Sequence, residues 1–151
     1  MIHNEQGRTM LEMLGVIAIM GIIVYGAIAG INYGMSSYKI NQTYTEVQNI
    51  VQGIQDLYSW SRQYDTSENM MAAACDNDIF STKCIDNNKV SSQFGDITIK
   101  PIENNGIKTN FKIEIVVPNQ SDRARLTEMD WPAIHVKQPE ENNTTLTFIP
   151  E

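Results

Sequence analysis

The sequence predicts an α+β fold in which one long N-terminal helix packs on a small antiparallel β-sheet. A 19-residue apolar run is followed, with no Gly, Ser or Pro linker, by apolar residues at helical spacing. Short segments of alternating apolar and polar residues fill the second half of the chain, and an Asn-Asn-Gly hairpin-turn sequence separates two of them. A helix laid over such a sheet buries the apolar face of both elements.

The apolar run extends from Met13 to Ile31, and no charged residue occurs between Met13 and Tyr38. A helix needs about 20 apolar residues to cross the hydrocarbon core of a bilayer. A cleaved signal peptide has a shorter apolar region followed by a small-residue cleavage site. This run is longer and no such site follows it cleanly. A membrane-spanning segment is therefore expected, and an ordinary uncleaved anchor stays open as an alternative.

The helix is expected to continue beyond the apolar run as an amphipathic segment. Its apolar residues recur at three- and four-residue steps: Ile40, Tyr44, Val47, Ile50, Val51, Ile54, Leu57 and Tyr58. A continuous helix of about 53 residues would be about 80 Å long at 1.5 Å per residue. Its first half would lie in the membrane and its second half would cover a globular head.

The rest of the head is expected to hold short elements. Residues 64–93 are polar and irregular, with a short helix possible at 70–74. A short helix is also expected between Ser121 and Met129, with Ser121 as its N-cap. Alternation of apolar and polar residues predicts four strands, at 97–102, 111–117, 134–136 and 146–148.

Charge and motifs exclude several functions. Arg8 and Lys39 offset Glu5 and Glu12, so residues 40–151 hold the whole formal net charge of −7. An acidic head without a basic stripe argues against nucleic acid as a partner. No glycine-rich phosphate loop, nucleophile elbow or helical metal-ligand pair occurs, so neither an enzyme nor a cofactor or metal is expected. The acids Asp76, Asp78 and Asp86 are better explained as solvated loop residues than as a calcium site.

The two cysteines, Cys75 and Cys84, lie beyond the apolar run. If the N-terminus stays in the cytoplasm, they reach an oxidising compartment where disulfides persist. Structural zinc requires four Cys or His ligands, and this chain adds only His3 and His135. A disulfide is favoured, with two free thiols as the alternative.

Gly7 is followed after four residues by Glu12 and then by the apolar helix. This arrangement resembles the N-terminal signal of type IV pilins and type II secretion pseudopilins. The resemblance implies cleavage after Gly7 by a prepilin peptidase and methylation of the new amine of Arg8. It also implies that Glu12 pairs with the N-terminal amine of a neighbouring subunit during assembly. Arg8 departs from the apolar residue usual in the family, and the leader has no basic residue. Arg8 can still hold that end of the helix in the cytoplasm.

The resemblance divides the chain into a leader (1–7), a transmembrane or filament-core helix (8–39) and a globular pilin-like head (40–151). Gly26, Gly30 and Gly34 are spaced four apart and so share one helix face, where small residues allow close helix packing. Glycine is also common in membrane helices without such a role, so both explanations stay open.

The expected function is that of a structural subunit of a type IV pilus or a type II secretion pseudopilus, serving cell adhesion or protein secretion. Its partners would be further pilin subunits in a homo-oligomeric filament, the prepilin peptidase, the inner-membrane assembly machinery and membrane lipid. It would reside in the bacterial inner membrane and then in a cell-surface or periplasmic filament, with the head extracytoplasmic. The alternative is a single-pass membrane-anchored periplasmic binding domain that does not polymerise.

Overall fold

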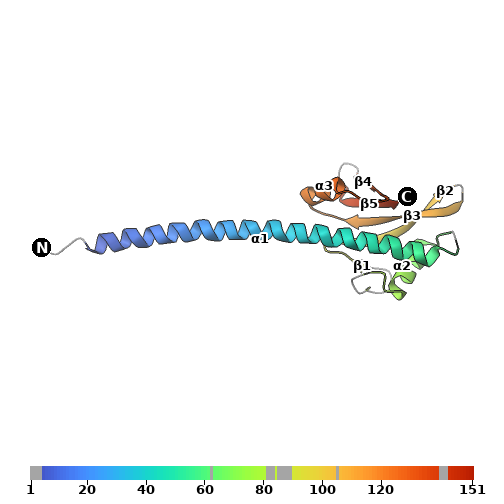
Figure 1. Ribbon diagram of the computed structural model, residues 1–151, viewed down its shortest axis with the longest axis horizontal. Helices are drawn as coiled ribbons and strands as arrows, with labels where there is room; N and C mark the ends of the chain where they lie inside the picture. The colour runs from blue at the N-terminus through green and yellow to red at the C-terminus, as the bar shows by residue number, and fades with distance from the viewer. Residues whose placement is uncertain (1–4, 62, 81–83, 85–89, 105, 140–142) are drawn as a thin grey trace. The chain divides into compact units, whose positions relative to one another are not determined.

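The computed structural model describes residues 5–61, 63–80, 84, 90–104, 106–139 and 143–151, with side chains from Met10 onwards except that of Asn104. The chain divides into two compact units, residues 1–38 and residues 39–151. Three helices and five strands follow one another in the order α1, α2, β1, β2, β3, α3, β4 and β5 (Figure 1).

Helix α1 spans Glu5–Tyr58, which is 54 residues, and passes from the apolar segment into the head without a break. The predicted continuous helix is thus present. It begins inside the predicted leader, since no proline occurs there to stop it. It ends where the hydroxyls of Ser59 and Ser61 donate hydrogen bonds to the carbonyl oxygens of Asp56 and Tyr58, which satisfies two of the last helical acceptors. Trp60, two residues after the end of the helix, is 97% exposed to solvent.

The five strands form one antiparallel sheet in the order β1-β2-β3-β5-β4. Their bounds are Val90–Ser91 (β1), Asp96–Asn104 (β2), Ile107–Val116 (β3), Ile134–Lys137 (β4) and Thr145–Pro150 (β5). The four expected strands are present, and β1 is additional, because two residues are too few to show an alternating pattern. Gly106 has φ +80° in the turn between β2 and β3, as the Asn-Asn-Gly sequence predicts. Asn105 lies outside the described residues.

Two local predictions need correction. Helix α2 spans Ser67–Asp76, longer than the predicted 70–74, because the Thr66 hydroxyl accepts a hydrogen bond from the backbone N–H of Asn69 and so caps the helix earlier. Helix α3 spans Gln120–Glu128, and its N-cap is Asn119, not Ser121. The N–H and hydroxyl of Ser121 both donate to Oδ1 of Asn119, so Ser121 is a donor in the first turn.

The core of the head lies between the C-terminal part of α1 and one face of the sheet. The strands contribute alternating buried residues, among them Ile97, Ile99, Phe111, Ile113, Ile115, Leu146 and Phe148. The helix contributes Ile40, Val47, Ile50, Val51 and Ile54, at the spacing that the sequence predicts. Each such side chain contributes about 1.5–3 kcal/mol when it is fully buried. The α+β fold class is therefore confirmed.

An aromatic cluster closes the core near α3. The Trp131 ring lies with its centroid 4.7 Å from that of Tyr44 on α1 and 4.9 Å from that of Phe148 on β5. Its Nε1–H donates a 2.7 Å hydrogen bond to the carbonyl oxygen of Leu126. This hydrogen bond satisfies the polar atom of the ring. Because Trp131 is only 8% exposed, its apolar surface is removed from water.

Candidate functional site

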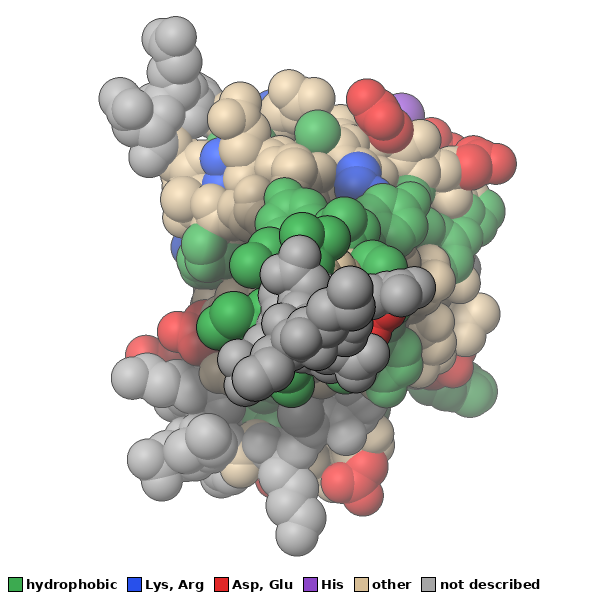
Figure 2. Space-filling model, turned by 90° about the vertical axis from the view of Figure 1, so that its left-hand side faces the viewer, with side chains coloured by type: hydrophobic (Ala, Val, Ile, Leu, Met, Phe, Trp, Pro, Cys, Tyr) green, Lys and Arg blue, Asp and Glu red, His purple; other side chains and the backbone are tan. Residues whose placement is uncertain are grey.

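The N-terminal part of α1 presents an uncovered apolar surface. Every large apolar side chain from Met10 to Tyr38 is more than half exposed, from 55% at Ile28 to 78% at Leu11 and Tyr25. By length and composition this helix can cross a membrane. Hydrophobic side chains are visible on the face shown in Figure 2. So large an apolar surface requires lipid or other helices to cover it.

Glu12 is the one charged side chain between Met10 and Tyr38, and it is exposed on α1. A carboxylate beside an apolar helix is costly in a bilayer unless a cation pairs with it. Because Glu12 is exposed, a cation from outside this chain can reach it. The backbone of Gly7 and Arg8 lies in the first turns of α1. The side chain of Arg8 precedes Met10 and so lies outside the described side chains. Cleavage after Gly7 and methylation at Arg8 stay predictions.

Gly26, Gly30 and Gly34 leave one face of the apolar segment open. A Cβ atom added at any of the three would meet no atom within 4 Å. At 3.6 residues per turn, a step of four residues rotates by only about 40°, so the three positions follow a narrow stripe along the helix. Another helix could approach this stripe closely; the packing role remains a prediction.

Gly53, in the head part of α1, was missed by the sequence reasoning. A Cβ atom there would lie 2.7, 2.8 and 3.0 Å from three side-chain carbons of Ile79. The glycine therefore lets the chain after α2 pack directly against α1. The available signal was a glycine inside an amphipathic helix far from any turn, which usually marks a close approach or a helix end.

Cys75 at the end of α2 and Cys84 form a disulfide bond, with their Cα atoms 5.9 Å apart. This agrees with the predicted pair, and no cysteine of the chain is free. The bond closes the loop beside Ile79, whose N–H donates to the carbonyl oxygen of Ala74. The disulfide and the Gly53 contact thus fix the same short segment against the head.

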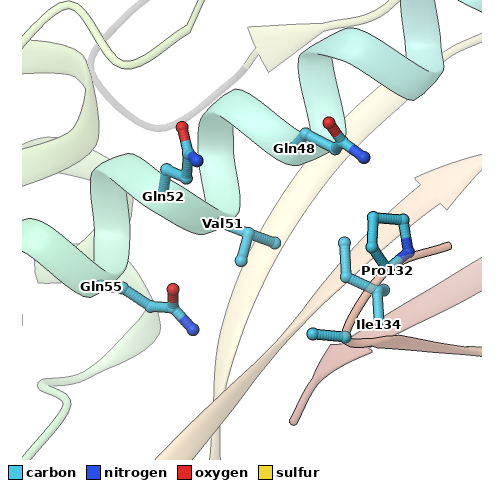
Figure 3. Close-up of a pocket in the computed structure, with 7 residues that line it drawn as sticks. Gln48, Val51, Gln52, Gln55, Pro132 and Ile134 are labelled. Carbon is cyan, nitrogen blue, oxygen red and sulfur yellow. The ribbon is translucent and has the colours of Figure 1, made fainter.

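A pocket of about 280 Å³ lies between α1 and the start of β4 (Figure 3). One wall of the pocket is formed by α1, from which Gln48, Gln52 and Gln55 project at successive turns, together with Val51. The other wall is formed by Pro132, Ala133 and Ile134. Ala133, between Pro132 and Ile134 in this wall, has φ +57°. The volume lies just below the usual range of small-molecule sites, about 300–1,000 Å³. No pattern in the sequence indicated this pocket.

Ion pairs lie on the sheet face turned away from α1. Glu114 accepts from Nζ of Lys100 at 2.6 Å and contacts Nζ of Lys112 at 2.7 Å. Partial burial acts to raise the pKa of the Glu114 carboxyl, but the two lysines outweigh it and lower the pKa below its usual value. At the sheet edge, Nε2 of His135 lies 2.8 Å from a carboxylate oxygen of Glu151.

Two tyrosine rings pack against each other, tilted by 49°, near the C-terminal end of α1. The ring centroids of Tyr58 and Tyr64 are 5.4 Å apart, and Tyr64 also contacts the ring of Phe111. Burial raises the pKa of both phenols, and the nearby charge of Asp65 raises that of Tyr58 further. Both phenols therefore stay neutral at physiological pH, which suits packing rather than acid–base chemistry.

Within the described part of the chain, no group of three or more His, Cys, Asp or Glu side chains is placed to hold a metal ion. Asp86, one of the loop acids considered for calcium, lies outside the described residues. Comparison with protein-family models, with curated proteins and with solved structures found no match.

Proposed function

We propose that this chain is a pilin-like structural subunit, held in the bacterial inner membrane by the apolar part of α1 and assembled into a filament with its head extracytoplasmic. One observation carries the proposal: the uncovered apolar surface from Met10 to Tyr38 belongs to the same helix whose C-terminal part forms the head core. An anchor that only tethers a domain needs no such continuity, and a linker usually joins the two. A helix shared by both parts is what a subunit needs if its apolar segment is to pack in a filament core.

Glu12 supplies the assembly contact in this proposal. Buried among apolar helices, its carboxylate requires a cation, and the resemblance to pilins supplies the N-terminal amine of the neighbouring subunit. After cleavage behind Gly7, that amine belongs to Arg8. The stripe of Gly26, Gly30 and Gly34 would let neighbouring helices come close enough for the pair to form.

Intact mass of the protein isolated from bacterial membranes that contain a prepilin peptidase and the assembly machinery tests the proposal. The expected mass corresponds to residues 8–151 with one methyl group, and sheared preparations should contain filaments of this chain. A full-length mass together with an absence of filaments would refute the proposal. Filaments at the cell surface would indicate a pilus and adhesion; filaments confined to the periplasm would indicate a secretion pseudopilus.

The pocket beside Gln48, Gln52 and Gln55 favours a second candidate, a membrane-anchored periplasmic binding domain that remains monomeric. That candidate keeps residues 1–7 and forms no filament, so the same measurement separates the two. The proposed structural subunit is preferred because the pocket is small, whereas the uncovered apolar surface covers more than half of α1.

A further inference from the structure

The outer face of the sheet, turned away from α1, concentrates lysines on an otherwise acidic head. Lys100 and Lys112 lie directly opposite each other on β2 and β3, and both contact Glu114. Lys137 on β4 lies opposite Thr147 on β5, which in turn lies opposite Glu114. Three lysines therefore lie on this face, and two of them contact Glu114; they are here named the lysine face (Lys100, Lys112 and Lys137).

Two carboxylates at the margins of this face each contact a neighbouring side chain. Glu151 contacts His135, and Asp96 accepts a hydrogen bond from the Ser91 hydroxyl. Glu114 takes up part of the charge of Lys100 and Lys112, whereas Lys137 forms no ion pair with another described residue. Among the described residues, Lys137 is therefore the lysine of this face whose charge no contacting carboxylate offsets.

Helix α2 presents the opposite charge. Residues 64–80 contain four acids and no Lys or Arg. Met70, Met71 and Ala74 point into the core, so the outward side of α2 carries Glu68, Ala72 and Asp76, four residues apart. Glu68 and Asp76 are exposed, and the alanine between them leaves room for a close approach. These three residues are here named the acidic ridge.

The spacing of the two surfaces matches. Eight residues of helix place Glu68 and Asp76 about 12 Å apart along α2, at 1.5 Å per residue. Lys112 and Lys137 are separated by two strand spacings and by two residues along the strands, which gives a diagonal of about 12 Å. Thr147 and Ile149 of β5 lie between the two lysines and are half-buried, so they offer a low surface to Ala72.

From this match we propose that the acidic ridge of one copy docks across the lysine face of the next copy, with Asp76 at Lys137 and Glu68 at Lys112. Asp76 ends α2, where the helix dipole adds negative charge, and so it suits Lys137, which forms no ion pair with another described residue. The two surfaces differ, so the contact can be head-to-tail, and it generates an open chain of subunits when the rotation between copies does not close a ring. The inference rests on the proposed filament function and names the head contact within it.

Charge reversal in the full-length protein, produced with its assembly machinery, tests the contact. Lys137→Glu should weaken association by about two- to fivefold per contact, the range of exposed ion pairs, and so lower the filament yield. Adding Asp76→Lys should restore the yield. Adding Glu128→Lys instead is the matched control, because Glu128 is likewise the exposed last residue of a helix, and it restores the same net charge at another place.

Carbodiimide cross-linking of wild-type filaments built from mixed light and heavy isotope subunits gives a second measurement. The expected product is an intermolecular Asp76–Lys137 bond. The inference is overturned if wild-type filaments form but lack this product, or if Asp76→Lys restores yield no better than Glu128→Lys. Cross-links from Lys137 to a different protein would overturn it as well. If wild-type protein forms no filaments at all, the proposed function fails, and this inference fails with it.

Discussion

Gly53 and Ile79 are in such close contact that a single added methyl group would overlap three carbons of the isoleucine, the nearest at 2.7 Å. The contact joins the head part of α1 to the segment that the disulfide closes. It shows that α1 supports the head on two sides, through its apolar face on the sheet and through a glycine against the loop after α2.

Gly53→Ala should lower the free energy of unfolding of the head. Overpacking costs about 1–3 kcal/mol and the better helix propensity of alanine returns about 1 kcal/mol, so the net loss should be up to about 2 kcal/mol. Denaturant unfolding of the detergent-solubilised protein measures it. Ile79→Val should relieve part of the loss in the double variant, and Gln52→Ala, on the exposed side of the same turn, is the control. A Gly53→Ala variant that is more stable than wild type by the full helix-propensity gain of about 1 kcal/mol would contradict the close contact.

Removal of the disulfide should also destabilise the head. The bridge joins Cys75 to Cys84, nine positions apart, and loop-closure entropy predicts a loss of about 2–3 kcal/mol when a loop of this size is opened. The Cys75→Ser/Cys84→Ser double variant, unfolded beside oxidised wild type, gives the difference. Labelling of both thiols in native, unreduced protein would contradict the bond itself.

Glu114 should make the stability of the head sensitive to acid. Its pKa is lowered in the folded state, so its contribution is fully present above the pKa of the unfolded chain and is lost as pH falls through the folded value. Unfolding midpoints measured from neutral pH to below pH 4 should therefore fall less steeply for Glu114→Gln than for wild type. Parallel curves for the two proteins would show that the lysine pairs contribute no pH-dependent stability.

Most of the fold could be predicted from the sequence, because strong periodic patterns specify it. The alternation around Phe111 and Ile113 identified β3, and the three- and four-residue steps from Ile40 onwards identified the buried side of α1. The pairing of Cys75 with Cys84 followed from their compartment and from the absence of other cysteines.

What could not be predicted depends on contacts distant in sequence. Strand β1 exists because Val90 pairs with Ile97, and two residues carry no pattern of their own. The choice of Asn119 over Ser121 as N-cap is a competition between two good capping residues, which only the backbone geometry decides. The pocket and the Gly53 contact each join α1 to a later segment. For the candidate site, the composition of the N-terminal segment predicts the exposed apolar surface and the position of Glu12. The lipid or neighbouring helices that would cover this surface belong to other molecules, so the sequence of one chain cannot specify them.

Glu12→Ala should separate insertion from assembly. Removing a charge from an apolar segment should leave membrane insertion unchanged or slightly improved. Filaments should be lost, because the amine of the adjoining subunit would be left unpaired, and breaking one side of a buried pair costs about 3–5 kcal/mol. Membrane fractionation and filament recovery measure the two effects. Filaments of the variant in wild-type amounts would rule out the proposed role of Glu12.

Gly7→Val should block processing, since the resemblance to pilins implies a peptidase that requires a small residue before the cleavage point. The variant should accumulate with residues 1–7 attached, as intact mass would show, while wild type loses them. Gly15→Ala is the control, because it lies in the same helix and an added Cβ there meets no atom within 4 Å. A wild type that keeps residues 1–7 would contradict cleavage after Gly7, and a variant that loses them as wild type does would contradict the need for a small residue there.

The two tryptophans of the chain occupy opposite environments, with Trp131 in the aromatic cluster and Trp60 almost fully in water. Each ring is therefore an intrinsic fluorescent probe of a different event. Emission from Trp131 should lie at short wavelength and report unfolding, while emission from Trp60 should lie at long wavelength and be quenched by iodide. With Trp131→Phe to isolate the second signal, loss of iodide quenching during polymerisation would show directly that neighbouring subunits cover the end of α1.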